Sequence, residues 1–488
     1  MNEEIYSKYE TVVGLEIHAQ LSTLSKAYAS DSAGYGDDPN TNISAITLGH
    51  PGTLPKVNEK VIDFAIKMGL ATQCQIRLEN QYARKNYFYA DLPKGYQITQ
   101  DTTPICFNGH LTVKTKDGIE KRIGITRIHM EEDAGKSIHD QDMYDSLIDL
   151  NRAGVPLIEI VSEPDIRSAE EAGIYIAEIR KLLRYLEICD GNMEEGSMRC
   201  DANISVRLKG ATSFGNRCEV KNLNSIRNVQ RAIEYEVKRQ IDVIEAGGII
   251  DQNTLNYDAV SGTTSVLRSK EMANDYRYFP EPDLPPVFLT DQYINEVHDL
   301  MPALPDELYK RFVNEYKLSD YDAQLLLEQK DIALYYMDLI QHTKNYKSAA
   351  NWIMGAVKSY LNEQAIEIHS FILKPSQIAE IIQLIDDGKI NSTVANQQLF
   401  PAMLNNASKK AIDIAQELNL IISTNNDELK VFIKEVLTKY PEKVLEYKSG
   451  KKGLLGLFMG EVMKLSKGKL DPKTANTLLL EELENDQL

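Results

Sequence analysis

Acidic side chains recur at alternate positions in short segments of the sequence that have the apolar–polar alternation of a β-strand. In Val12–Leu21, Glu16 and His18 would share one face of the strand, with apolar residues on the other. Three further segments repeat the pattern: Ser197–Arg207, Arg217–Lys221 and Ile128–Asp133. If these strands share a sheet, one of its faces collects carboxylates, an imidazole and guanidinium groups. Carboxylates bind hard divalent cations and arginines bind phosphate, so the pattern indicates a metal–nucleotide site.

Each alternating segment taken alone is more simply explained as a strand with one solvated face. The occurrence of four such segments, one of which places His two residues after Glu, favours chemistry over solvation. We therefore expect a set of acids and one histidine to converge on a single divalent ion: Glu16, His18, Asp201 and Glu219, with Glu131 or Glu132.

Known phosphate-binding loops are missing from the sequence, which contains neither GxxxxGK[ST] nor GxGxxG. If the chain uses ATP, a metal and arginines must hold the phosphates on the surface of a sheet. For each arginine a surface salt bridge is the simpler role. The candidate nucleotide-binding arginines are Arg152, Arg199, Arg207, Arg268 and Arg277.

Two segments, Arg84–Gln97 and Asp275–Pro280, interleave cationic and aromatic residues. Such mixtures can stack unpaired bases, although half-buried strands often have the same composition. No cysteine lies in a nucleophile-like context with a histidine, and GxSxG is absent. We therefore expect no thiol or serine acyl-enzyme mechanism, and no glutaminase, in this chain.

The composition of the chain argues against several classes of protein. The 488 residues carry a net charge of −18, which argues against broad, nonspecific binding of nucleic acid. The sequence has no apolar run long enough for a membrane helix, and its acidic start lacks the features of a secretory signal. The five cysteines show no zinc-ligand spacing. We expect a cytoplasmic protein with reduced, buried thiols.

The order of the predicted elements is typical of an α+β fold followed by helices. Amphipathic helices are expected over about Ser168–Asp190 and Ser225–Ala246, each beginning at a capping serine. The proline-rich stretch Phe279–Pro286 marks the end of the mixed region. We expect a catalytic domain over 1–292, a helical domain over 293–412 and a helical tail over 413–488 in which lysines cluster.

Six motifs together identify a family. They are Gly14–His18, Arg84–Gln97, His129–Lys136, Asp149–Asp165, Glu194–Ser205 and Lys221–Ser225. With these motifs the chain resembles, over essentially its whole length, the B-subunit family of the heterotrimeric tRNA-dependent amidotransferases. The Asp149–Asp165 string is too long and specific to match by chance.

The resemblance implies a first domain like the catalytic domain of glutamine synthetase, built as an antiparallel sheet cradle with helices. It implies phosphorylation by ATP, with Mg²⁺ or Mn²⁺, of the side-chain carboxylate of Glu-tRNA(Gln) or Asp-tRNA(Asn). Ammonia from the amidase A subunit would then displace the phosphate, and a small C subunit would complete the heterotrimer.

The resemblance also implies roles for particular residues. The metal-site positions are Glu16, His18, Glu131, Glu132, Asp201 and Glu219. Among the residues expected to act on the reacting groups are Glu131, Glu132, Arg199 and Asp201. Lys85, Tyr87 and Lys94 would belong to a polar ammonia passage. The resemblance implies a tail that contacts tRNA, and from the lysine cluster itself we expect the contacts with tRNA phosphates to be made by Lys448, Lys451, Lys452, Lys464, Lys467 and Lys469.

Two other interpretations remain open on the residues alone. A free-standing ligase of the glutamine synthetase type would have the same sheet, but it has no use for a lysine-rich helical tail. A non-catalytic tRNA-binding scaffold would have no reason to collect uncompensated carboxylates on one strand face, where like charges repel.

Overall fold

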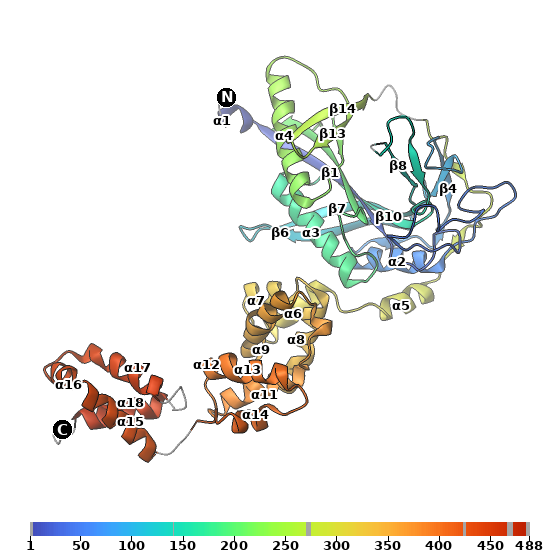
Figure 1. The fold of residues 1–488 in the computed structure, drawn as a ribbon. Coiled ribbons are helices and arrows are strands. Elements are labelled where there is room, and N and C mark those ends of the chain that lie inside the picture. The colour runs from blue at the N-terminus through green and yellow to red at the C-terminus, as the bar shows by residue number, and fades with distance from the viewer. Residues whose placement is uncertain (1–2, 140, 270–274, 423–425, 466–471, 485–488) are drawn as a thin grey trace. The chain divides into compact units, whose positions relative to one another are not determined.

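The computed structural model describes residues 3–139, 141–269, 275–422, 426–465 and 472–484. The chain forms two compact units, Met1–Pro305 and Asp306–Leu488 (Figure 1). The first is mixed α and β, and the second is helical throughout its described residues. The α+β class expected from the sequence is therefore confirmed. No helix among the described residues has the length and apolar character needed to cross a bilayer.

A nine-stranded sheet forms the centre of the first unit. All four alternating segments predicted from the sequence belong to it, so the condition for collecting their ionisable side chains on one sheet is met. In spatial order the strands are β14 (Thr263–Ser269), β13 (Asn253–Asp258), β12 (Cys218–Lys221), β11 (Met198–Leu208), β1 (Tyr9–Gln20), β10 (Pro156–Ser162), β7 (Glu120–Glu132), β6 (Cys106–Lys114) and β2 (Gln75–Ile76).

One pair of neighbours departs from the expected antiparallel sheet, because β12 and β13 run parallel. Between them in the sequence lies α4 (Ile226–Glu245). A long helix returns the chain to the end of the sheet from which it left, so the next strand runs in the same direction as the one before. The remaining neighbours in the sheet are antiparallel.

Helices cover the apolar face of the sheet. The core includes Leu15 and Ile17 of β1 and residues of α2 (Glu59–Ala71) and α3 (Ala169–Tyr185), while α4 packs on β11 (Figure 1). Alternation then leaves the polar residues of the same strands on the opposite face.

Both predicted serine caps are confirmed. The Ser168 side chain accepts a hydrogen bond from the Glu171 amide, and the Ser225 side chain accepts one from Asn228. The first helix ends earlier than predicted, because the chain turns at Glu187 with φ of 56°. This turn directs Ile188 and Cys189 into the core.

Short strands add three small sheets to the first unit. In one of them β4 (Ala83–Asn86) lies between β15 (Phe279–Pro280) and β5 (Tyr96–Thr99). The others pair β3 (Glu79–Asn80) with β16 (Val287–Phe288), and β8 (Lys136–Ile138) with β9 (Leu147–Asp149).

The proline-rich stretch belongs to the first unit and is not a linker. Arg84 of β4 donates two hydrogen bonds to the carboxylate of Glu281, at 2.7 and 2.8 Å, and the Glu281 side chain is fully buried. Val297 of α5 (Asp291–Asp299) is also buried in the core of this unit. The first unit thus extends to Pro305, beyond the expected boundary at residue 292.

The second unit is built from helices and short helical turns. They are α6 (Pro305–Asn314), α7 (Asp320–Leu326), α8 (Lys330–His342), α9 (Tyr346–Trp352), α10 (Lys358–Gln364), α11 (Pro375–Asp386), α12 (Ser392–Val394), α13 (Phe400–Asn405), α14 (Ala411–Glu417), α15 (Asn426–Lys439), α16 (Pro441–Lys448), α17 (Leu455–Leu465) and α18 (Pro472–Glu484).

The lysine-rich tail has a hydrophobic core of its own, which begins at Leu429 of α15 and includes Phe458 and Leu479. Helix α14 packs instead against α11 and α13. The predicted boundary at residue 413 therefore falls inside a helix that belongs with the preceding ones.

Candidate active site

Ionisable side chains form a row across four adjacent strands on the polar face of the sheet. The strand register places His129 of β7 opposite Glu159 of β10, Glu159 opposite His18 of β1, and His18 opposite Arg199 of β11. Directly opposed residues lie within reach of one another's side chains. The row therefore follows from pairing between distant segments.

Three residues of this region form the first acid group: His18, Glu131 and Glu159. His18 Nε2 lies 3.2 Å from Glu159 Oε2 and 3.7 Å from Glu131 Oε1. His129 Nε2 lies 3.4 and 3.6 Å from the same two carboxylates. Burial by itself would lower the pKa of His18, but the carboxylates of Glu159 and Glu131 outweigh it and raise that pKa to about 9. A divalent ion would replace that proton on His18.

Glu16, Asp201 and Glu219 form a second acid group, with one oxygen of each lying within 4.8 Å of the others. Glu16 is directly opposite Asp201 in the strand register. Burial raises the pKa of Glu16, and repulsion from Glu159, Glu219 and Asp201 raises it further. A cation beside these three acids would therefore be stabilised by them.

From the sequence we expected one ion shared by all of these acids, whereas the structure divides them between two groups. Glu16 and His18 are two residues apart on one strand, which separates their backbones by about 7 Å. The ligand atoms of one Mg²⁺ or Ca²⁺ lie only about 2.0–2.6 Å from the ion. Each group by itself offers a donor set that fits a hard divalent ion: carboxylate oxygens alone, or with one imidazole.

A cavity of about 350 Å³ adjoins both groups and is lined by His18, Glu131, Asp201 and Arg199. The Arg199 guanidinium donates to Asp133 Oδ2 at 2.8 Å, and its Nε has no hydrogen-bond partner among the described residues. Asp133 also accepts from the Gln20 side chain at 2.7 Å. Arg199 is thus held beside the acid groups, with its side chain 38% exposed.

Lys85 and Tyr87 line the same cavity. The Lys85 ammonium lies 5.0 Å from the centre of the Tyr276 ring and 6.0 Å from that of Tyr87. Burial opposes the charge on Lys85, but Glu131 and other neighbours outweigh it and raise its pKa. Lys85 therefore remains a cation beside the first acid group.

Glu132 lies on the other side of the strand from Glu131, because neighbouring residues of a strand point to opposite faces. Its carboxylate accepts from the Lys94 ammonium, and from the Ile98 amide at 2.9 Å. This placement corrects the expectation that Glu132 joins the acids on the polar face.

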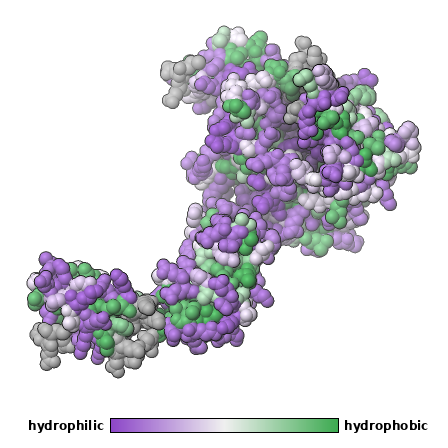
Figure 2. All heavy atoms as spheres, in the orientation of Figure 1, coloured by the Kyte–Doolittle hydropathy of each residue, from purple (hydrophilic) through white to green (hydrophobic). Residues whose placement is uncertain are grey.

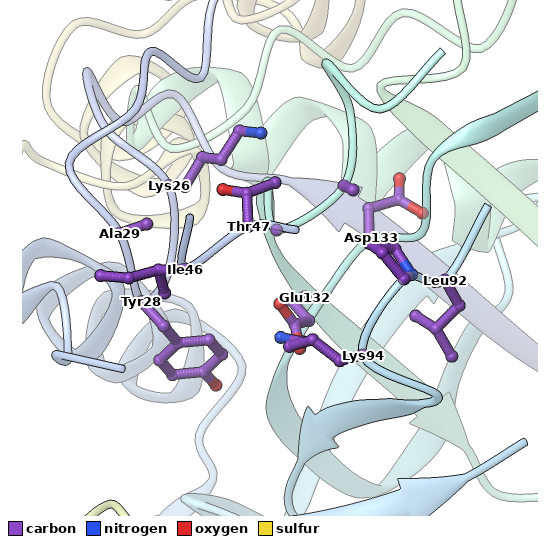
Figure 3. A pocket seen from close by; sticks show the side chains of 12 residues that line it. Lys26, Tyr28, Ala29, Ile46, Thr47, Leu92, Lys94, Glu132 and Asp133 are labelled. Atoms are coloured by element: carbon purple, nitrogen blue, oxygen red, sulfur yellow. The ribbon is translucent and has the colours of Figure 1, made fainter. Parts of the chain in front are cut away.

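Lys94 and Glu132 line a separate, small cavity of about 20 Å³ together with Lys26 and Tyr28 (Figure 3). The Lys26 side chain is almost fully buried, and its ammonium donates to the Asn42 carbonyl at 2.7 Å. Burial lowers the pKa of Lys26 to about 8. A cavity of this size holds about one water-sized molecule.

Three of the other predicted nucleotide-binding arginines, Arg152, Arg207 and Arg277, do not line the cavity that Arg199 lines. Arg152 donates to the carbonyls of Ala134 and Gly135 at 2.9 and 2.6 Å. Arg207 pairs with Glu10 at 2.6 Å, and Arg277 is exposed beside Asp275. Arg268 lies in β14, but its side chain is outside the described residues.

The structure describes four of the six tail lysines that were predicted to bind tRNA. Lys448, Lys451, Lys452 and Lys464 are exposed, whereas Lys467 and Lys469 lie outside the described residues. Lys451 pairs with Glu446 at 3.1 Å, and the Lys452 ammonium lies 4.2 Å from the centre of the Tyr447 ring.

Figure 2 shows mainly hydrophilic residues on the visible faces of the chain, with hydrophobic ones in small groups between them.

Residues that the sequence analysis had not singled out also belong to the site. Glu159 completes the first acid group, His129 contacts it, and Lys221 contacts the second group. One signal could have revealed Glu159, since it is the only charged residue in the strand Pro156–Ser162, which is otherwise apolar up to its final serine. A lone carboxylate in a buried strand requires partners, and partners at such a position indicate a site.

Comparison with known proteins places the chain in a family. Residues 11–295 match the GatB/GatE catalytic domain, and residues 334–483 match the GatB domain. The chain is 46% identical over 480 residues to the B subunit of the aspartyl/glutamyl-tRNA(Asn/Gln) amidotransferase of Caldicellulosiruptor bescii, covering 98% of this chain and 99% of the relative. It is 48% identical over 479 residues to the B subunit of the same enzyme from Alkalilimnicola ehrlichii, covering 98% of this chain and 100% of the relative. The chain therefore belongs to the GatB family of tRNA-dependent amidotransferase B subunits.

Proposed function

We propose that this chain uses ATP to phosphorylate the side-chain carboxylate of Glu-tRNA(Gln), Asp-tRNA(Asn) or both, and that ammonia then displaces the phosphate to give the amide. It would act in the cytoplasm, in a heterotrimer with an amidase A subunit that releases the ammonia and a small C subunit. We further propose that the first unit is related to the catalytic domain of glutamine synthetase.

The observation that carries this proposal is the pair of acid groups, which adjoin one cavity that the Arg199 side chain also lines. A carboxylate is a poor acyl electrophile because oxide is a poor leaving group. Phosphoryl transfer overcomes this, and its transition state spreads negative charge over the phosphoryl oxygens. Divalent ions held by Glu16, Asp201 and Glu219 and by His18, Glu131 and Glu159 would neutralise that charge. Arg199 would donate to the phosphate.

The oxygen balance of the reaction offers a direct test. Aminoacyl-tRNA with ¹⁸O in the side-chain carboxylate is incubated with the complex, ATP and ammonium. Attack of the carboxylate on ATP and displacement by ammonia carry one carboxylate oxygen into inorganic phosphate. We expect ¹⁸O in the phosphate by mass spectrometry, and no amide without ATP. Phosphate free of ¹⁸O, with amide formed at the normal rate, would contradict the acyl-phosphate route.

We propose that ammonia passes the small cavity beside Lys94 and Glu132 on its way to the carboxylate, with Lys85 and Tyr87 nearer the reaction. The cavity has room for about one ammonia molecule, and polar side chains, among them Lys26, Lys94 and Glu132, line it together with apolar residues, which supports this route. Enclosure keeps both ammonia and the acyl phosphate away from bulk water.

The tail lysines are proposed to hold tRNA through its phosphates. Replacing Lys451, Lys452 and Lys464 with Ala should raise the KM for mischarged tRNA and leave kcat nearly unchanged, because the acid groups lie in the other unit. Affinity should also become less sensitive to salt, by about 0.7–0.9 log units per log of salt for each lost phosphate contact. Steady-state kinetics at several salt concentrations measure both effects.

A matched control replaces three exposed lysines of the same unit that lie outside the tail, Lys317, Lys374 and Lys410. This control should leave KM and its salt dependence as in the wild type. An equal change in both triple variants would mean that the tail lysines act only through the overall charge.

A further inference from the structure

Lys221 places its own positive charge in the second acid group. Its ammonium lies 2.5 Å from Asp201 Oδ2 and 2.7 Å from Glu219 Oε1. The position follows from the local sequence, since Cys218 and Val220 are buried in the core and Glu219 and Lys221 point to the opposite face. The register that pairs Ala202 with Val220 brings Asp201 beside Lys221.

Neutral donors orient two of the three acids of this group, Glu16 and Glu219, independently of Lys221. The Asn203 side chain donates to Glu16 Oε1 at 2.9 Å, and the Thr254 hydroxyl donates to Glu219 Oε2 at 3.0 Å. The other oxygen of Glu219 is the one that faces Lys221. Carboxylates held in this way keep their positions when the ammonium leaves, which a metal site requires.

The two acid groups differ in the type of side chain that pairs with their carboxylates. Within the part of the chain that the structure describes, the ion pairs of Glu131 and Glu159 are formed with the imidazoles of His18 and His129. The second group instead contains a full ammonium from the chain itself. The ion-pair partner in the first group is therefore an imidazole, whose proton a divalent ion can replace, whereas the partner in the second group is a lysine ammonium, which must move away as a whole.

We propose that Lys221 holds the second ion position in the absence of ATP, and that a second divalent ion enters it only when phosphate draws the ammonium away. This inference rests on the proposed use of ATP. Both cations cannot use the same oxygens, since Mg²⁺ must approach its ligands to about 2.0–2.1 Å and would repel the ammonium at that distance.

Lys221 has room to make this movement. Its side chain is 30% exposed and lines the same cavity as Arg199. A lysine ammonium on a flexible stem is a common partner of phosphate. Once displaced into the cavity, it would bind the nucleotide phosphates, so that binding of the second ion becomes linked to binding of ATP.

Mn²⁺ titration of the full chain, followed by electron paramagnetic resonance, tests this order of binding. The wild type should bind one Mn²⁺ tightly without nucleotide and a second only with the non-hydrolysable analogue AMP-PNP. Lys221→Met should bind the second ion without nucleotide, about tenfold or more tightly than the wild type, because the competing charge is gone. Lys221→Arg, which keeps the charge, should resemble the wild type.

Lys121→Met is the matched control, since Lys121 is also a strand lysine in an ion pair, with Glu171 at 2.6 Å, but lies outside the acid groups. It should not change Mn²⁺ binding. Unchanged second-ion affinity in Lys221→Met overturns the inference and leaves the proposed function standing. Absence of Mn²⁺ binding by the wild type even with AMP-PNP defeats the proposed metal-dependent activation as well. If Lys221→Met does not fold, two wild-type sites of equal affinity without nucleotide overturn the inference.

Discussion

Glu159→Gln is expected to lower the rate of ATP-dependent amidation by about 10²–10³-fold, even when free ammonium replaces glutamine. Glu159 contributes an anionic oxygen to the first acid group and contacts both His18 and His129. The amide keeps the shape of the side chain but removes the negative charge that a divalent ion needs. Amide formation from mischarged tRNA, ATP and ammonium measures the effect.

Glu163→Gln provides the matched control. Glu163 follows the same strand but is exposed, and its carboxylate accepts from the Thr126 hydroxyl at 2.7 Å. This variant should amidate at close to the wild-type rate. The role assigned to Glu159 would be wrong if Glu159→Gln kept wild-type activity with ammonium.

Lys94→Met should destabilise the first unit by about 3–5 kcal/mol, because it leaves the buried Glu132 carboxylate without its cation. The side chains of Lys94 and Glu132 are 13% and 3% exposed, so water cannot replace the lost partner. The double variant Lys94→Met/Glu132→Gln removes both charges and should recover part of this loss. Denaturant unfolding, monitored by a signal from the first unit, gives the free energy of unfolding of the wild type, Lys94→Met and the double variant.

Lys136→Met controls for the loss of a lysine, since Lys136 is exposed in β8, and should change stability by less than about 0.5 kcal/mol. The proposed ammonia route adds a second measurement. At a temperature where the double variant is folded, glutamine-dependent amidation should fall more than ammonium-dependent amidation. Equal losses in the two assays would assign Lys94 and Glu132 to stability alone.

Local patterns in the sequence were enough to predict four of the strands that carry the site and two helices of the same unit, but not β10, which carries Glu159. Alternation identified β1 and β11 because a sheet with one buried face imposes a period of two on its residues. Serine caps located the starts of α3 and α4 because a helix leaves its first amides without partners. Both signals lie within about 20 residues of sequence, so no knowledge of distant contacts was needed.

Long-range pairing decided the domain limits and the direction of one strand. The proline-rich stretch has the composition of a linker, but Glu281 within it is buried against Arg84, nearly 200 residues earlier in the chain. Likewise, β13 runs parallel to β12 because α4 crosses over the sheet between them.

The sequence by itself determined which ionisable side chains lie on the polar face of these strands, because backbone alternation is a local property: Glu16, His18, Asp201 and Glu219 all follow from it. Only the tertiary structure decided how these acids are grouped. Inserting β10 between β1 and β7 brings Glu159 against His18, and pairing β12 with β11 brings Lys221 against Asp201. The order of strands in a sheet is set by packing and by connections across the whole unit, so the division into two acid groups is a property of the fold.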